Sequence, residues 1–130
     1  MKASKSITDT ELAVLKLLWA RGSSTAKEIT EELYPDCTAS DVGTVHSMLQ
    51  RLESKEFVRR DRSSHAHRFS AALSHTEMVG LQLEEIADKL SDGSYVPFVT
   101  HLVEENRLDQ DDLDKLRTLL DRHKSKRTKR

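Results

Sequence analysis

Residues 41–68 constrain the fold more than any other segment, because a helical pattern is followed at once by a basic hairpin pattern. Four apolar residues spaced i, i+3, i+4, i+7 make one buried helix stripe. They are Val45, Met48, Leu49 and Leu52. The stripe predicts a helix over residues 41–55, with Asp41 as its N-cap. The residues that follow alternate in polarity and turn at residues 62–64, which predicts a β-hairpin.

The outer face of this helix carries small polar side chains, which suit the width and chemistry of a DNA major groove. Arginines on an adjacent hairpin suit the phosphate backbone. The expected base-contacting residues are Gly43, Thr44, His46 and Ser47, and the expected phosphate-contacting residues are Arg51, Arg60, Arg62 and Arg68. Alternation along a strand places Arg59 on the face opposite Arg60. Plainer interpretations stay open, namely a helix face and a charged hairpin without a ligand, and an ion pair between Arg51 and a nearby acid.

Two further helices precede this segment. Thr8 and Glu11 form the capping-box pattern T-x-x-E, which predicts a first helix that ends at Gly22. Thr25 and Glu28 repeat the pattern and predict a second helix, which ends at residues 34–36. Three short helices followed by a hairpin is the order of elements in a winged helix-turn-helix.

Three amphipathic helices follow the hairpin. Ser74 and Glu77 predict one to about residue 90, Pro97 suits the first turn of one over about 97–105, and Asp109 predicts one to about residue 122. Three short helices can form only a thin core. We therefore expect them to pack against a second copy of the chain. The expected dimerisation residues are Val79, Leu83, Ile86, Leu90, Phe98, Leu102, Leu113, Leu116 and Leu120.

The predicted fold class is therefore mainly α with a small β-hairpin. We expect a winged-helix DNA-binding domain over residues 1–73, a three-helix dimerisation domain over 74–122, and a basic, disordered tail over 123–130.

The formal net charge of −1 hides a division along the chain. Residues 43–72 carry six Lys and Arg against three Asp and Glu, whereas residues 73–121 carry four against twelve. The field at the contact face matters for DNA binding, so a near-neutral total does not exclude it. The acidic segment leaves an alternative open, in which the winged helix is a protein-interaction module that binds through residues 73–121. Four arginines in the hairpin favour DNA binding over this alternative, namely Arg59, Arg60, Arg62 and Arg68.

Several other classes lack support. Cys37 is the only cysteine, which excludes an intrachain disulfide and favours the cytoplasm. No apolar run approaches the roughly 18 residues of a membrane span. His65 and His67 would fall on one strand face, but no cysteine or carboxylate converges on them, so we expect no metal and no cofactor. No nucleophile elbow or glycine-rich phosphate loop is present, so we do not expect an enzyme.

Four motifs together resemble the penicillinase-repressor (BlaI/MecI-type) family of winged-helix transcriptional repressors, over about residues 7–120. They are T-x-x-E-L-x-V-L-K-x-L-W at 8–19, S-T-A-K-E-I at 24–29, T-V-x-x-M-L-Q-R-L-E-x-K at 44–55 and H-A-H-R-F at 65–69. The resemblance implies a homodimer whose third helices enter the major groove at the two halves of a palindromic operator. The C-terminal helices would form the dimer contact.

The chain departs from the family pattern at several positions. Gly43 replaces the first residue of a usual Thr-Thr-Val, Glu56 stands where Gly is common, and His67 stands where an aromatic residue, often Tyr, is usual. Relatives under a membrane sensor are cleaved at Asn-Phe in the fifth helix, whereas the matching pair here is His101-Leu102. The C-terminal Cys-x-Cys of copper-responsive relatives is absent. The sequence therefore identifies neither the inducer nor a regulatory protease, and leaves open whether release occurs by proteolysis or by a ligand.

Overall fold

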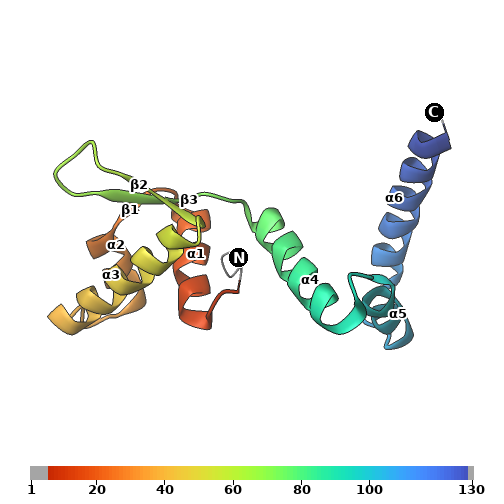
Figure 1. The fold of residues 1–130 in the computed structure, drawn as a ribbon, viewed down its shortest axis with the longest axis horizontal. Helices are drawn as coiled ribbons and strands as arrows, with labels where there is room; N and C mark the ends of the chain where they lie inside the picture. Colours follow the sequence, from red (N-terminus) through yellow and green to blue (C-terminus); the bar gives the residue numbers. More distant parts are fainter. Residues whose placement is uncertain (1–5, 129–130) are drawn as a thin grey trace. The chain divides into compact units, whose positions relative to one another are not determined.

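The computed structural model describes residues 6–128, with side chains to residue 124. Within this range the chain forms six helices and three short strands (Figure 1). In chain order they are α1 (Asp9–Arg21), β1 (Ser24–Thr25), α2 (Ala26–Leu33), α3 (Ala39–Ser54), β2 (Val58–Asp61), β3 (Arg68–Ala71), α4 (His75–Ser91), α5 (Val96–Glu104) and α6 (Gln110–Thr128). The chain divides into two compact units, one up to Ile86 and one from Ala87 onward.

Helices α1 and α2 begin at the two predicted capping boxes. The Thr8 hydroxyl accepts from the Glu11 N–H, and the Glu11 carboxylate accepts from the Thr8 N–H at 3.0 Å. Thr25 and Glu28 make the same reciprocal pair at the start of α2. Gly22, with φ 82°, caps the C-terminus of α1, as expected.

Helix α3 begins earlier than expected. Its N-cap is Thr38, whose hydroxyl accepts from the Asp41 N–H, while the Asp41 carboxylate accepts from the Thr38 N–H at 3.0 Å. The prediction that Asp41 is the N-cap is therefore wrong. Asp41 is the third helical residue of a capping box in which aspartate takes the place of the usual glutamate.

The end of α3 sets the path into the hairpin. Glu56 adopts a left-handed conformation with φ 65°. The Phe57 N–H donates to the Leu52 carbonyl and the Glu56 N–H donates to the Glu53 carbonyl, which is the hydrogen-bond pattern of a Schellman motif. Leu52 and Phe57 are both buried, so the motif also contributes to the core.

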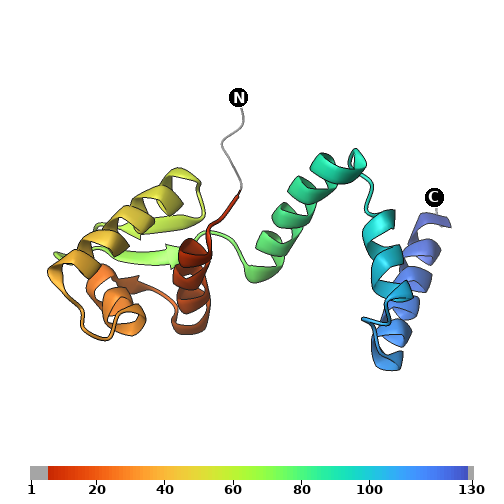
Figure 2. The same cartoon turned by 90° about the horizontal axis from the view of Figure 1, so that it is seen from below.

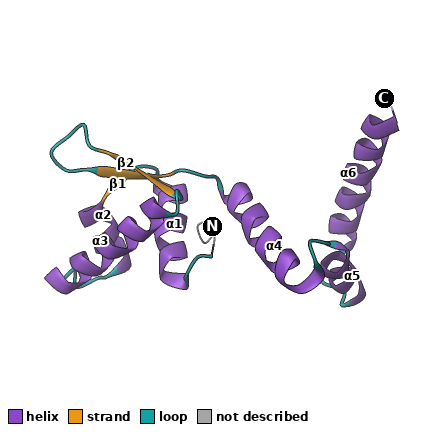
Figure 3. Ribbon diagram, viewed as in Figure 1, coloured by secondary structure: helices purple, strands orange, loops and turns teal. Residues whose placement is uncertain are grey.

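The sheet contains three antiparallel strands in the order β1-β3-β2, where the sequence predicts a two-stranded hairpin (Figure 3). Strand β1 has only two residues and therefore no periodicity by which the sequence could predict it. The connection between β2 and β3 spans residues 62–67, which is longer than expected. His65 and His67 therefore lie in a loop, and the prediction that they share a strand face is wrong.

The three N-terminal helices gather on one face of this sheet (Figures 1 and 2). Their core includes the predicted stripe of α3, and Val58 and Phe69 pack the hairpin onto it, as expected. Phe57 is 1% exposed and belongs to the same core, although the sequence analysis did not assign it. The first half of α4 joins this core through Met78, and the indole N–H of Trp19 donates to the Leu73 carbonyl at 2.9 Å.

Helices α4, α5 and α6 confirm the predicted C-terminal elements. Ser74 and Glu77 form the expected box, Pro97 lies in the first turn of α5, and Asp109 accepts from the Asp112 N–H at 2.8 Å. Helix α6 continues to Thr128, so the prediction of a disordered tail is wrong for residues 123–128. Residues 129–130 lie outside the described residues.

The C-terminal unit has little core of its own. Of its hydrophobic side chains that the structure describes, Ala87 alone is buried. No helix in residues 6–128 is long and apolar enough to cross a membrane. The compact units divide inside α4 rather than at the predicted residue 73, and the functional division into DNA-binding and dimerisation domains stays a prediction.

Candidate nucleic-acid interface

Helix α3 separates a buried stripe from an exposed polar face. Its four predicted apolar residues are each 1% exposed or less. Gly43, Thr44, His46 and Ser47 are all exposed, together with Gln50. The expected amphipathic arrangement is confirmed, while base contact by these residues stays a prediction.

The chemistry that Thr44 offers is narrower than its residue type suggests. Its hydroxyl donates to the Ser40 carbonyl of the preceding turn at 3.0 Å. The hydroxyl proton is therefore occupied, and the oxygen lone pairs and the methyl group remain for a ligand. Such a group can accept from a base amino group or contact a thymine methyl.

Gly43 leaves open space on the same face. Apart from its chain neighbours and the nearby backbone of α3 itself, no atom lies within 4 Å of the position where a Cβ would stand. The backbone is therefore accessible at the point where the family carries a threonine side chain.

Arg51 connects this face to a buried carboxylate. Its Nε donates to Glu11 Oε2 at 3.1 Å, and Lys55 Nζ donates to Glu11 Oε1 at 2.9 Å. Burial raises the pKa of Glu11, but the hydrogen bonds from Thr8, Lys55 and Arg51 outweigh it and lower that pKa from 4.5 to about 2. The alternative of an ion pair for Arg51 is thus confirmed. Its side chain is 54% exposed, so it also reaches solvent beside Ser47.

The three wing arginines also have intramolecular partners. Arg60 lies 3.0 Å from Glu53, and its guanidinium stacks 4.8 Å from the centre of the Phe69 ring. Arg62 lies 3.8 Å from Glu53. Arg68 donates to the Ser23 carbonyl at 2.7 Å and lies 3.6 Å from Glu28.

The three wing arginines differ in how much of each side chain remains exposed for contact with a ligand. The Arg60 side chain is 18% exposed, whereas those of Arg62 and Arg68 are 64% and 42% exposed. Arg60 therefore holds the wing against α3 before any ligand arrives. Phosphate contact by the four arginines stays a prediction.

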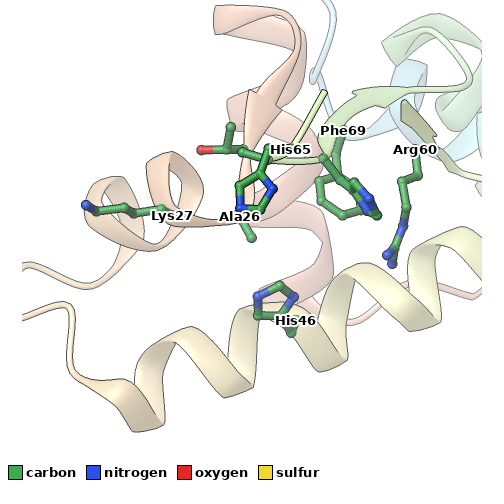
Figure 4. A pocket seen from close by; sticks show the side chains of 9 residues that line it. Ala26, Lys27, His46, Arg60, His65 and Phe69 are labelled. Carbon is green, nitrogen blue, oxygen red and sulfur yellow. The ribbon is translucent and has the colours of Figure 1, made fainter. Parts of the chain in front are cut away.

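A hollow of about 400 Å³ lies between α3, the N-terminus of α2 and the wing (Figure 4). It is lined by Thr25, Ala26, Lys27, His46, Arg60, His65, Ala66, His67 and Phe69. The lining comes from three segments that only the fold brings together, so the sequence predicted neither this grouping of the histidines nor the place of Lys27 in it. Within the described residues, no three His, Cys, Asp or Glu side chains are grouped as metal ligands would be.

The predicted dimerisation residues are unusually exposed for their type. Val79, Leu83, Ile86 and Leu90 of α4 are 43%, 43%, 42% and 66% exposed. Leu102, Leu116 and Leu120 are also exposed, while Phe98 and Leu113 are half-buried. Their contact with a second copy stays a prediction.

Comparison with known proteins places the chain in a family. A family model described as penicillinase repressor matches residues 7–122. The transcriptional regulator BlaI of Mycobacterium tuberculosis is 34% identical over 116 residues, which cover 86% of this chain and 80% of that protein. The penicillinase repressor of Bacillus licheniformis is 23% identical over 127 residues, which cover 98% of each chain.

A solved structure supports the same fold. The solution structure of the DNA-binding domain of the repressor BlaI is 27% identical, with a TM-score of 0.50, and covers 59% of this chain and 93% of that domain. The relatives named here are repressors and regulators rather than enzymes, in agreement with the sequence analysis. Together with the three-helix, three-strand arrangement of its N-terminal unit, these matches show that the chain belongs to the penicillinase repressor family of winged-helix proteins.

Proposed function

We propose that this protein is a sequence-specific, DNA-binding transcriptional repressor. The observation that carries the proposal is the exposed polar face of α3, which lies beside a basic wing in a member of the penicillinase repressor family. A relative's domain with the same fold is a DNA-binding domain. The protein would act by occupying an operator that overlaps a promoter, which requires no chemical step.

The protein would make two kinds of contact with DNA, one to base edges and one to phosphates. Thr44, His46 and Ser47 would reach base edges, and Gly43 would let the backbone come close to the groove floor or to a phosphate. Arg51, Arg62 and Arg68 would reach phosphates with the part of each guanidinium that intramolecular acids leave exposed. Arg60 would act more by holding the wing in place.

We further propose that the repressor is a homodimer on a palindromic double-stranded operator. The exposed apolar residues of α4, α5 and α6 support this, because a second copy would remove them from water. A two-fold dimer requires inverted half-sites, separated by about one turn of DNA or a multiple of it.

The competing function is a protein-interaction module that binds through the acidic segment 73–121. The two functions differ in their dependence on salt. A DNA-binding protein loses affinity for duplex DNA steeply as salt rises, because phosphate contacts release counterions. An interaction module with an acidic surface would show no retention on duplex DNA at low salt.

Thr44→Ala tests the base-contact part of the proposal. Its matched control is Thr118→Ala in α6, where the hydroxyl makes the same bond to the carbonyl four residues earlier, at 3.0 Å. On the duplex that the protein enriches from random DNA, Thr44→Ala should reduce the preference over random duplex by about 5-fold, which is about 1 kcal/mol. Thr118→Ala should leave this preference unchanged. Equal preference in the wild type and both variants would contradict the assignment of Thr44.

A further inference from the structure

The hollow beside α3 has a one-sided charge. Its ionisable lining residues are Lys27, Arg60 and the three histidines His46, His65 and His67, and no acidic side chain lines it. Figure 4 shows His46 projecting from α3 towards the wing, where His65 lies, with Lys27 and Arg60 at opposite ends. A basic hollow on the face expected to meet DNA fits an anion.

The surrounding acids already have partners, and one of them, Glu53, offsets the charge of Arg60 in the lining. On α2, Glu28 accepts from the Thr25 N–H and lies 3.6 Å from Arg68. On α3, Glu53 lies 3.0 Å from Arg60. On β2, the Asp61 carboxylate accepts from the Ser63 N–H at 2.9 Å, and hydrogen bonds from Ser63 lower its pKa, with smaller contributions from Arg68 and His67.

The protein backbone adds to this field. The first turn of α2 opens on the hollow through Ala26 and Lys27, which follow the N-cap Thr25. Helix N-termini carry a partial positive charge and unpaired N–H groups, which favour phosphate. This contribution does not titrate, whereas imidazole is the side chain that changes charge between about pH 5 and pH 8.

We propose that this hollow is a phosphate subsite of the DNA interface, in which His65 and His67 contact one stretch of the DNA backbone and His46, at the edge of the base-reading face, adds its charge to the same stretch. The inference rests on the proposed DNA-binding function and adds a property to it. Protonation of the histidines raises the positive charge of the subsite, so affinity for DNA rises as pH falls. Lys27 contributes a charge that is constant over the same range.

The six histidines of the chain provide a matched experiment. Three line the hollow, and His75, His101 and His123 lie outside it. One variant carries His46→Gln, His65→Gln and His67→Gln, and the control carries His75→Gln, His101→Gln and His123→Gln. Binding of the full-length protein to a labelled random-sequence duplex is followed by fluorescence anisotropy at pH 6 and pH 8, at constant ionic strength.

The wild type and the control should bind about 10-fold more tightly at pH 6 than at pH 8. The hollow variant should lose most of this difference. Its slope of log affinity against log salt at pH 6 should be shallower by about 0.9 for each phosphate that the variant no longer neutralises. Lys27→Gln should weaken binding at both pH values and keep the pH difference. A hollow variant that retains the wild-type pH difference would overturn the proposal.

Two other outcomes have distinct meanings. Wild-type protein that binds no duplex at either pH would contradict the proposed function itself rather than the subsite alone. Inorganic phosphate is the second probe, with the histidine ring signals followed by NMR in the free protein. Signals of His46, His65 and His67 that saturate with phosphate alone, combined with a pH-independent DNA affinity, would show a free-anion site and overturn the assignment to the DNA backbone.

Discussion

The two compact units bury their apolar residues to very different extents. In the N-terminal unit, fourteen hydrophobic side chains from α1, α2, α3, α4, the hairpin and its flanking turn form one buried cluster. In the C-terminal unit, Leu90, Val96 and Leu120 remain 66%, 68% and 68% exposed. Both units are built from amphipathic helices, and all of them except α5 begin at a side-chain cap. Amphipathic sequence patterns therefore produce helices in both units. A substantial core forms only in the unit where the helices pack against a sheet.

This difference indicates a different kind of partner for each unit. The N-terminal unit buries most of its hydrophobic side chains, apart from Val79, Leu83 and Ile86 of α4, and leaves a polar helix face exposed. The C-terminal unit retains apolar surface that a second copy of the chain would cover. The proposed dimer would complete this small core, which is the size that a few short helices can build.

Truncation of one leucine in each unit tests the contrast with the largest expected effect. Leu52 is 0% exposed, so Leu52→Ala should lower the free energy of unfolding by about 2–5 kcal/mol through reduced burial and a cavity. Leu90→Ala, at a residue 66% exposed, should change the stability of the N-terminal core by less than about 0.5 kcal/mol. Urea unfolding followed by fluorescence of Trp19, the only tryptophan, reads that core.

In sedimentation equilibrium the two variants should show the opposite order, with the larger effect on the monomer–dimer equilibrium in Leu90→Ala. Leu90→Ala should increase the monomer fraction, since it removes part of the proposed dimer contact. Equal decreases of stability in the two variants would mean that the units share one core, and the contrast between the units would be incorrect.

Replacement of Glu11 should have a smaller, pH-dependent effect. The pKa of Glu11 is lowered to about 2 from 4.5, so its contribution to stability is full above pH 4.5 and disappears as the pH falls towards 2. Glu11→Gln should therefore cost at most about 3 kcal/mol at neutral pH, and the gap from the wild type should close in acid.

Glu32→Gln is the matched control for Glu11→Gln. Glu32 forms an exposed ion pair with Arg21 at 3.5 Å, and such pairs contribute little. Its removal should cost less than about 0.5 kcal/mol at neutral pH. A Glu11→Gln cost that is constant from neutral to acid pH would show that the carboxylate charge is not what stabilises the junction of α1 and α3.

The smallest expected effect is a gain in stability at Glu56. This residue has φ 65°, a conformation that costs a residue with a side chain about 1 kcal/mol and glycine almost nothing. Glu56→Gly should therefore raise the free energy of unfolding by up to about 1 kcal/mol. Asn106 occupies the same type of helix end after α5, with φ 56°, and asparagine tolerates it better. Asn106→Gly should give the smaller gain, and a decrease of stability in Glu56→Gly would contradict the strain argument.

Local patterns predicted most of the elements because their causes are local. The boxes at Thr8, Thr25 and Ser74 and the apolar stripe of α3 all depend on residues within one or two turns. The same reasoning placed the start of α3 too late, since Thr38 pairs with an aspartate rather than with the glutamate or glutamine of the usual pattern.

The parts that sequence reasoning missed depend on distant residues. Glu11 meets Arg51 and Lys55 across 40 and 44 positions, and nothing in the spacing of these residues announces the contact. The hollow gathers Lys27, His46 and His65 from three separate segments. Phe57 lacked a signal because the Schellman turn that buries it requires a left-handed residue, and the family's glycine is absent at Glu56.

Selection of bound sequences from random duplex DNA by the full-length protein tests the central claim most directly. The claim is that a self-sufficient N-terminal unit reads DNA bases and that an incomplete C-terminal unit pairs two copies. We predict enrichment of one inverted repeat whose half-sites lie about one helical turn, or a multiple of it, apart. A single unpaired half-site would contradict the pairing of two copies, and the absence of any enriched sequence would contradict base reading by α3.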